Sequence, residues 1–395
     1  MPSDVKPTNH ALWPLFAADF LVAMASGTVF PLLAGLQDAH HLPTYGLGLI
    51  AGGSFVGGLA AQVLLAGQAD RGRSRPLLVG GLVTACLALV WFALADQLWQ
   101  FVLARSMTGI ALGCFQPAAR AIAASVNPDA MGHSLGRLAG IELSGFILGP
   151  AVASALADAF NLDVPFLAMA VAIAVGGGVV LHKGLPDRAA TSTNSRVSPA
   201  LLRDRRIASA SVLALGLFLP VGVYESLWSR YLEDRGASTL FIGVSLTLYG
   251  LPFILFSSRG GRIADRVGAQ RACLMGIAFV VPVTIGYGLL HSPVAIVAIG
   301  LVEGVAAAVA APASQAYMVQ VCPPDRIAAG QGLAGAMSQL AAGLTALGAA
   351  PLYDIAGPAT VFTCAGVMIA VCAGVSYALG RTRRTPLPVP ATTGG

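Results

Sequence analysis

The chain has 395 residues, of which 56% are hydrophobic and only 10% are charged, and its formal net charge is +5 at pH 7. Soluble globular proteins carry about 25% charged residues, so this composition excludes an ordinary soluble domain and predicts helices that face lipid. The basic residues are scattered over many short segments, which excludes a single nucleic-acid-binding face, and no series of alternating ten-residue segments indicates a membrane β-barrel.

Twelve apolar runs follow one another along the chain, and most are close to the ~20 residues that a helix needs to cross a bilayer. We therefore expect an all-α multi-pass membrane protein with a six-helix bundle in residues 1–181 and a second in residues 207–380. A polar cytoplasmic linker at 182–206 joins them, and a disordered cytoplasmic tail at 381–395 ends the chain. The runs cover residues 11–33, 46–67, 76–94, 98–122, 134–157, 164–181, 207–232, 241–258, 272–290, 293–319, 328–352 and 359–380.

The distribution of Lys and Arg predicts the orientation of the chain in the membrane. With the N-terminus placed in the cytoplasm, all but three of the 23 basic residues fall in cytoplasmic segments. Arg230 and Arg235 fall on the opposite side, and Arg105 lies within a predicted span. Because positive charge accumulates in cytoplasmic loops, both termini are expected in the cytoplasm of a cell with this protein in its inner or plasma membrane.

The two halves of the chain share a repeat with an offset of 195 residues. The offset relates Ala69-Asp70-Arg71 to Ala264-Asp265-Arg266, Gly109 to Gly304, and Pro117 to Pro312. An internal repeat that coincides with two six-helix halves is typical of secondary transporters.

The second copy of the repeated segment, Gly261–Arg271, resembles the cytoplasmic loop signature G-x-L-A-D-R-x-G-R-R of the major facilitator superfamily. It also lies between the second and third helices of its half, as in that family. The first copy keeps Ala-Asp-Arg and departs from the signature elsewhere. The resemblance implies the twelve-helix major facilitator fold and a loop that stabilises one conformational state. The gating residues it implies are Asp70, Arg71, Gly261, Asp265, Arg266 and Gly268.

The fifth run contains Gly145, Gly149 and Pro150, and it is similar to the antiporter signature G-x-x-x-G-P-x-x-G-G of exporters in the same superfamily. Glycines four residues apart form a flat helix face that permits close contact with another helix. The second half has Leu344-Thr345 at the positions of Gly149-Pro150. Ordinary helix packing remains the alternative interpretation, and the resemblance favours export over uptake.

Ionisable residues inside predicted spans are the candidates for proton coupling. A charge in a membrane span is costly, so each is expected to face the protein interior and to find a partner. Arg105 also resembles the arginine of the family's R-x-x-x-G motif, which is linked to proton handling in antiporters. Structural ion pairs remain the alternative for every one of these groups. The candidates are Asp19, Arg105, Glu142, Glu225 and Glu303.

Aromatic and amide side chains near the expected pathway are candidates for substrate contact. An apolar site with few polar groups would suit amphipathic or lipophilic compounds. The candidates are Phe20, Phe115, Gln116, Tyr224, Trp228, Tyr249, Gln315, Tyr317 and Gln339.

The resemblance implies a transporter that exports a small amphipathic or drug-like molecule in exchange for protons by alternating access. Its expected partners are a small-molecule substrate, protons and the lipid bilayer, and we expect it to work as a monomer without nucleic acid. Exporters of a sugar, metabolite or lipid, and uptake permeases of the same fold, remain alternatives. Enzymatic activity is not expected, because the chain has no G-x-x-x-x-G-K-[ST], G-x-S-x-G or H-E-x-x-H motif. We expect no cofactor and no metal, and the proton gradient is the expected energy source.

Overall fold

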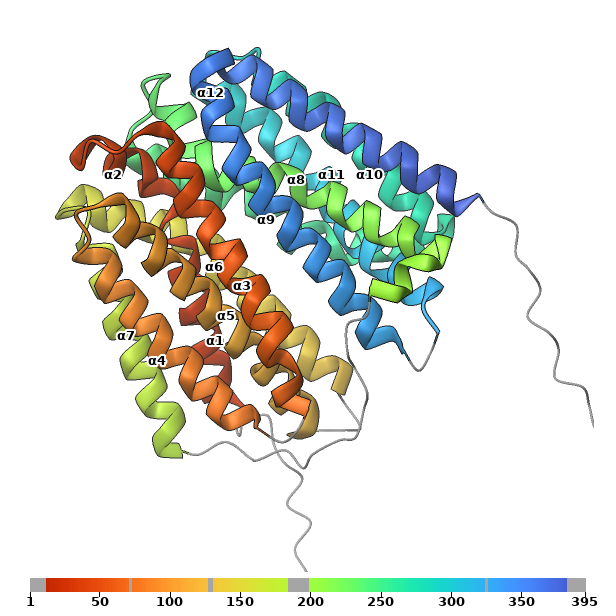
Figure 1. The fold of residues 1–395 in the computed structure, drawn as a ribbon, viewed down its shortest axis with the longest axis horizontal. Helices are drawn as coiled ribbons and strands as arrows, with labels where there is room; N and C mark the ends of the chain where they lie inside the picture. Colours follow the sequence, from red (N-terminus) through yellow and green to blue (C-terminus); the bar gives the residue numbers. More distant parts are fainter. Residues whose placement is uncertain (1–11, 71–72, 127–130, 184–198, 324–325, 382–395) are drawn as a thin grey trace, which may run out of the picture.

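The computed structural model describes residues 12–70, 73–126, 131–183, 199–323 and 326–381. The described residues of the first half are helical and pack as one bundle (Figure 1). Its elements are α1 Trp13–Gly27, η2 Phe30–Leu32, α2 Leu33–Ala39, α3 Thr44–Asp70, α4 Ser74–Ala93, α5 Leu98–Val126, α6 Met131–Ala159 and α7 Val164–Lys183.

A second bundle contains the described residues that follow. Helical structure enters the predicted linker 182–206 from both ends, since α7 continues to Lys183 and α8 begins at Arg205; residues 184–198 lie outside the described part. The elements of this half are η4 Pro199–Arg203, α8 Arg205–Glu233, α9 Thr239–Val267, α10 Ala269–Tyr287, α11 Pro293–Val321 and α12 Ile327–Gly380.

The helix α12 accounts for the last two predicted spans. Its 54 residues would extend about 80 Å as a straight helix, far more than the ~30 Å thickness of a bilayer core. The chain reverses at Gly357, where φ is +75°, and Pro358 follows. Because a positive φ is accessible mainly to glycine, this residue permits the turn between the two spans. With the reversal, the described helices provide the twelve spans that the sequence predicts.

Two predicted boundaries are wrong. The first span does not end at residue 33: it is interrupted after Gly27 and continues through η2 and α2 to Ala39. The signature segment that begins at Gly261 is not a loop, because α9 remains helical to Val267. Gly260 explains the continuation, since it packs against the backbone of α11 at Ala308. Helix α9 therefore still packs against α11 beyond the end of its apolar run.

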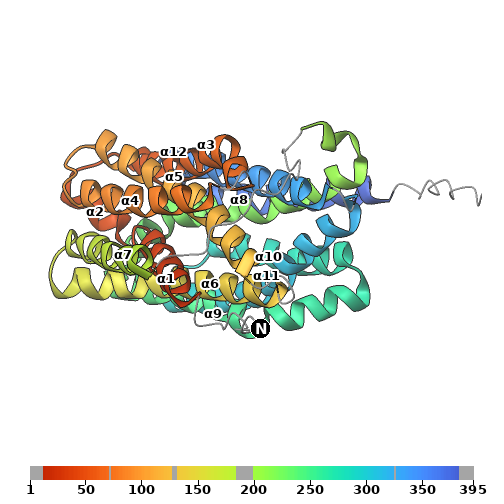
Figure 2. The same ribbon diagram turned by 90° about the horizontal axis from the view of Figure 1, so that it is seen from below.

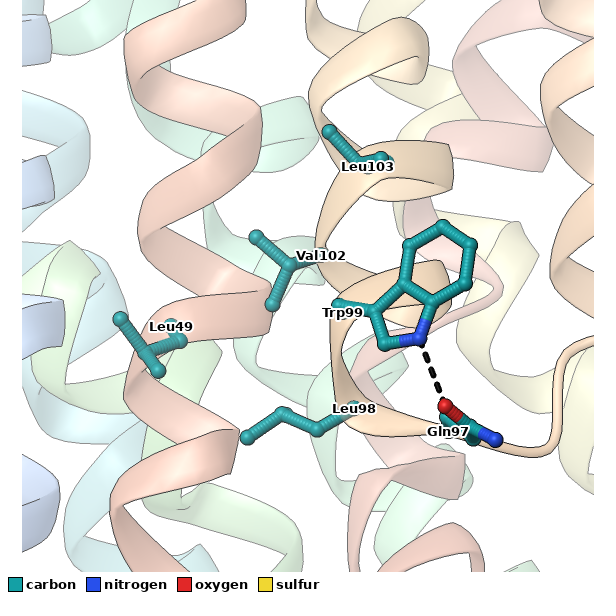
Figure 3. A pocket seen from close by; sticks show the side chains of 6 residues that line it. All are labelled: Leu49, Gln97, Leu98, Trp99, Val102 and Leu103. Atoms are coloured by element: carbon teal, nitrogen blue, oxygen red, sulfur yellow. Dashed lines mark hydrogen bonds between the residues drawn. The ribbon is translucent and has the colours of Figure 1, made fainter.

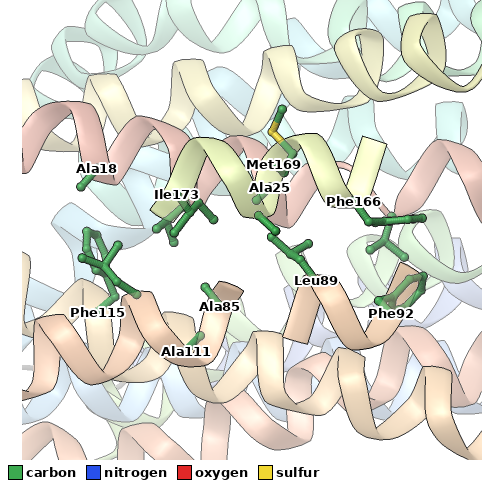
Figure 4. Close-up of a cluster of buried hydrophobic side chains, with 14 of the residues drawn as sticks. Ala18, Ala25, Ala85, Leu89, Phe92, Ala111, Phe115, Phe166, Met169 and Ile173 are labelled. Atoms are coloured by element: carbon green, nitrogen blue, oxygen red, sulfur yellow. The ribbon is translucent and has the colours of Figure 1, made fainter. Parts of the chain in front are cut away.

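The hydrophobic core of the first bundle lies between α1, α4, α5 and α7 (Figure 4). Phe92 packs against Phe166 with the two ring centroids 4.7 Å apart. Large apolar side chains also cover the outer surface, including Leu64, Val171 and Phe279. An apolar interior together with an apolar exterior is the arrangement expected of helices that face lipid.

The most extensive contacts between the two bundles are made by two pairs of helices. Figure 2 shows α3 beside α12 at one side of the molecule and α6 beside α9 at the other. Gly48 lies against the carbonyl of Ala346 in the first pair, and the Thr247 hydroxyl donates to the Ile147 carbonyl at 2.7 Å in the second. These contacts lie near the end that carries α2 and the bend of α12. In Figure 1 the bundles diverge toward the end of α7 and the start of α8.

Candidate functional site

Arg105 is a buried arginine on α5 that reaches across to the opposite bundle. Its Nη2 lies 3.9 Å from Oε2 of Glu225 on α8, and its Nη1 donates to the Ser26 carbonyl at 3.2 Å. The guanidinium carbon lies 4.8 Å from the centroid of the Phe30 ring. Its side chain is only 1% exposed, and Nε and Nη2 have no hydrogen-bond partner among the described residues. The structure thus places Arg105 and Glu225 together as an incompletely satisfied charge pair.

This charge pair lies near the end of the molecule that carries α2, where the two bundles are in contact; we call this end the closed end. Ser229 is one helical turn beyond Glu225, and its hydroxyl accepts a hydrogen bond from the Ala34 amide of the other bundle at 3.2 Å. Arg230, the next residue, forms an ion pair with Asp38 at 2.8 Å. The buried pair and these outer contacts all span the same interface between the two bundles.

A second cluster of charged residues lies within the first bundle. Asp19 on α1 is 2% exposed, and its Oδ2 has no hydrogen-bond partner among the described residues. Glu142 on α6 accepts hydrogen bonds from Gln116 at 2.5 Å and from Arg120 at 3.3 Å. Glu142 and Arg120 are the charged groups that act electrostatically on Asp19. Glu142 therefore has a cation and an amide as partners, whereas Asp19 has an oxygen without a partner.

The glycines of the antiporter-like motif hold this cluster together. A Cβ at Gly145 would fall on the carbonyl oxygen of Phe20, and one at Gly149 would fall on that of Met24. Pro150 of the same helix lies against Gly27. The small face of α6 therefore packs directly on the backbone of α1, and this contact sets the position of the Asp19 helix relative to Glu142.

Glu303 on α11 is enclosed by tyrosines of three other helices. Its two carboxylate oxygens accept hydrogen bonds from Tyr224 at 2.7 Å and from Tyr287 at 2.6 Å. The Tyr249 hydroxyl is a third group that acts on this carboxyl. Trp228 stacks edge-on against Tyr224 and donates from its indole nitrogen to Ser245 at 3.0 Å. The resulting cage contains a carboxylate that is 1% exposed.

The residues of the gating signature lie at helix ends away from these clusters. Asp265 and Arg266 are exposed in the last turn of α9. Gly268 ends that helix with φ of +93°, whereas a Cβ at Gly261 would meet no atom within 4 Å. Asp70 is the last residue of α3; its side chain and the whole of Arg71 lie outside the described part of the structure.

The substrate candidates do not converge on one place. Tyr224, Trp228 and Tyr249 line a small cavity with Leu246 and Tyr287. Gln116 belongs to the Glu142 cluster, and Phe20 lies where α1 contacts α6.

The remaining candidates are spread over both bundles. Gln339 lies beside Gly58 at the contact of α12 with α3. Phe115 is buried in the core of the first bundle, and Tyr317 is buried in the second bundle with its hydroxyl 3.1 Å from Ser209. Gln315 is exposed, and its carbonyl accepts from Gln331.

Arg120, Tyr287 and Asp38 are among the residues of these clusters that the sequence-based candidates do not include. Arg120 follows Gln116 by four residues and so occupies the same helix face, which is a signal that the sequence carries. Tyr287 and Asp38 gain their partners from other helices, and no spacing in the sequence indicates those contacts.

A larger hollow lies on the outer surface, away from every charged cluster. It has a volume of about 640 Å³. Figure 3 shows Leu49 of α3 facing Leu98 and Val102 of α5, with Trp99 beside Gln97 on the other side of α5. Trp99 is 53% exposed, and Leu49 is also exposed. Because its lining is apolar and exposed, we assign this groove to the lipid-facing surface. In the described part of the chain, no group of His, Cys, Asp and Glu residues could hold a metal ion.

Comparison with known proteins supports the fold and the class of function. The sequence matches the Major Facilitator Superfamily over residues 15–292 and 211–395. It is 25% identical over 315 residues to the multidrug resistance protein MdtG of Escherichia coli, covering 76% of this chain and 77% of MdtG.

Solved structures of two transporters resemble the whole chain. One is a point mutant of the nucleoside transporter NupG, with a TM-score of 0.79 at 15% identity, covering 93% of this chain and 98% of NupG. The other is a bacterial homologue of the human lysosomal transporter Spinster in an inward-facing conformation. Its TM-score is 0.79 at 14% identity, over 98% of this chain and 100% of that protein. The chain is therefore a multi-pass membrane transporter that belongs to the Major Facilitator Superfamily.

Proposed function

We propose that the protein exports small amphipathic or drug-like molecules from the cell in exchange for protons, as a monomer in the cell membrane. The similarity to MdtG, a multidrug resistance protein, supports export of such molecules. The antiporter-like face of Gly145 and Gly149 on α6 supports export over uptake. The similarity to NupG is below 25% identity and supports only the fold.

The ion pair between Arg105 and Glu225 carries the proposal for coupling. The two residues belong to different bundles, and they lie just inside the contacts that close one end of the molecule. Alternating access requires the bundles to separate at this end. Separation removes Arg105 from Glu225 and leaves the carboxylate without its cation. A proton from the opened side then neutralises Glu225 in place of Arg105. Opening of this end and proton uptake are coupled in this way.

Asp19 provides a second proton site in the proposal. Its carboxyl is buried with one oxygen that has no hydrogen-bond partner among the described residues, and Glu142 and Arg120 are its charged neighbours. A movement that changes the distance from Asp19 to Arg120 and Glu142 would change its protonation. The contact of Gly145 and Gly149 with α1 would transmit such a movement between the two helices.

The basic residues of the predicted cytoplasmic segments support an orientation with both termini inside the cell. In this orientation the contacts between α2 and α8 lie at the outer end, and the two bundles diverge toward the cytoplasm (Figure 1). Asp70 and Asp265 would then stabilise the opposite state, in which the cytoplasmic ends of the bundles approach each other. Their distance from the interface that is closed here agrees with this role.

Proton flux driven by substrate in proteoliposomes tests the proposal. The substrate is chosen from a growth-inhibition panel in an exporter-deficient host. When a gradient of this substrate is imposed, the wild-type protein should move protons in the opposite direction to the substrate and so change the pH of the lumen. Asp19→Asn and Glu225→Gln should each reduce this flux at least about tenfold, the scale expected when one group of a proton-transfer path is lost. Unchanged flux in both variants would contradict the coupling. Drug resistance that persists when an uncoupler collapses the proton gradient would contradict proton-driven export.

A further inference from the structure

Glu303 has no cationic partner among the described residues, unlike Glu225 and Glu142. Glu225 lies 3.9 Å from Arg105, and Glu142 lies 3.3 Å from Arg120. Among the described residues, no Lys, Arg or His lies within ion-pair distance of Glu303, which accepts hydrogen bonds from the hydroxyls of Tyr224 and Tyr287. A carboxyl that is 1% exposed and has no cation needs a proton or a positively charged ligand to remove the cost of its charge.

The surroundings of Glu303 match the chemistry of an organic cation. Tyr224 lies in edge contact with Trp228, Tyr249 and Tyr287, at ring-centroid distances of 5.4, 6.0 and 5.9 Å. Trp228 contacts Tyr287 at 5.3 Å. Aromatic rings attract a cation through their electron-rich faces, and this attraction is strongest where water is excluded. A carboxylate within an aromatic cage combines this attraction with charge neutralisation.

The cage is contracted in the described conformation. The cavity lined by Tyr224, Trp228, Leu246, Tyr249 and Tyr287 has a volume of about 20 Å³, which is space for about one water molecule. All of these residues and Glu303 belong to the second bundle, on α8, α9, α10 and α11. A ligand larger than water would therefore require the tyrosine and tryptophan side chains to rotate away from Glu303.

We propose that the Glu303 cage is a binding site for the positively charged head group of a lipophilic organic cation, and that this cation and a proton compete for Glu303. The inference rests on the proposed function and deepens it by naming the substrate class. When the cation binds, the O–H bond of the Glu303 carboxyl breaks, its proton leaves to water and the carboxylate pairs with the ligand. One positive charge replaces another, so the site exchanges its occupants without a change in its net charge.

The groups that face Glu303 make the exchange specific to this carboxyl. Its titratable neighbours are Tyr224 from α8, Tyr249 from α9 and Tyr287 from α10, and no charged residue acts on it among the described residues. Each tyrosine hydroxyl can donate to the carboxylate or accept from the protonated acid. The tyrosines therefore stabilise Glu303 in either state while the cage is empty.

Binding of tetraphenylphosphonium to the purified full-length protein in detergent tests the inference. The wild-type protein should bind this cation more weakly as the pH falls, and it should release one proton to a weakly buffered pH indicator for each cation bound. Glu303→Gln should weaken binding at least about tenfold, as expected when a buried charge partner is lost, and should abolish proton release. Tyr287→Phe should weaken binding less and keep proton release. Matched controls are Asp354→Asn, an exposed carboxyl of the same bundle, and Tyr377→Phe, an exposed tyrosine.

The outcomes separate this inference from the proposed function. If Glu303→Gln folds, as judged by gel filtration and circular dichroism, and binds tetraphenylphosphonium with wild-type affinity, the cage does not bind the cation. Binding by the wild-type protein with no proton release would contradict the competition. If Asp19→Asn, but not Glu303→Gln, abolishes proton release, exchange is retained as a function and the cage is excluded. If Glu303→Gln fails to fold, Trp228→Leu must weaken tetraphenylphosphonium binding, and unchanged binding would contradict the inference.

Discussion

The guanidinium of Arg230 lies 2.8 Å from the carboxylate of Asp38, and this ion pair joins α8 of one bundle to α2 of the other. Arg230 also lies 2.8 Å from Asp234, which accepts a hydrogen bond from Tyr353. The cross-bundle pair is thus held in place by a network within the second bundle. Because both partners are partly exposed, the pair lies at the rim of the closed end and must break when the bundles separate there.

Replacing Asp38 with Asn should favour the state in which this end is open. Exposed ion pairs contribute about 0.2–1 kcal/mol, so the ratio of open to closed molecules should rise by up to about fivefold. Spin labels at Tyr45 and Leu240, both exposed near this end on opposite bundles, would report the change as a larger population at long distance. The variant Asp163→Asn removes an exposed carboxyl and should leave the distances unchanged. Equal distance distributions for Asp38→Asn and Asp163→Asn would show that the ion pair does not stabilise closure.

Removing only Arg105 should destabilise the protein more than removing both members of its pair with Glu225. A buried charge that loses its partner costs about 3–5 kcal/mol, whereas replacement of both charges is far less costly. We therefore expect the thermal midpoint in detergent to fall most for Arg105→Met and to recover in part for Arg105→Met with Glu225→Gln. Additive losses in the double variant would mean that the two side chains do not stabilise each other.

Much of this arrangement follows from sequence features that report local chemistry. The apolar runs predict twelve spans, and the glycine spacing of α6 predicts a close helix contact, because both depend on residues within one segment. The expectation that Arg105 finds a buried partner also follows from the cost of charge in a membrane. The identity of that partner does not, since Glu225 is brought to it only by the packing of one bundle on the other.

The same distinction explains the features that the sequence did not predict. The continuation of α9 past Gly261 depends on the packing of Gly260 against Ala308 of another helix. The enclosure of Glu303 depends on tyrosines from three helices. The 195-residue offset aligns the halves with each other, but it carries no information about which residues of the two halves come into contact.

Gly149→Ala should disturb the contact that holds α1 against α6. The added Cβ would overlap the carbonyl oxygen of Met24, so the helices must separate, at a cost of about 1–3 kcal/mol. Gly140→Ala is the matched control on the same helix, because a Cβ there meets no atom within 4 Å. Alanine in place of glycine favours a helix by about 0.5–1 kcal/mol, so the control should unfold at the same or a higher temperature. Equal midpoints for the two variants would exclude a tight contact at Gly149.

Gly268→Ala should lower the thermal midpoint, because this residue ends α9 with φ of +93° and ψ of 136°. A side chain in such a backbone region costs about 1–3 kcal/mol. Asparagine tolerates the left-handed helical region, where ψ is about 30–60°. The ψ of Gly268 lies far outside that range, so Gly268→Asn should be no more stable than Gly268→Ala. Gly261→Ala, in helical backbone with open space around it, is the control and should unfold at or above the wild-type temperature. A wild-type midpoint for Gly268→Asn would mean that the turn after α9 adopts an ordinary left-handed conformation, and the second signature glycine would then have no unique structural role.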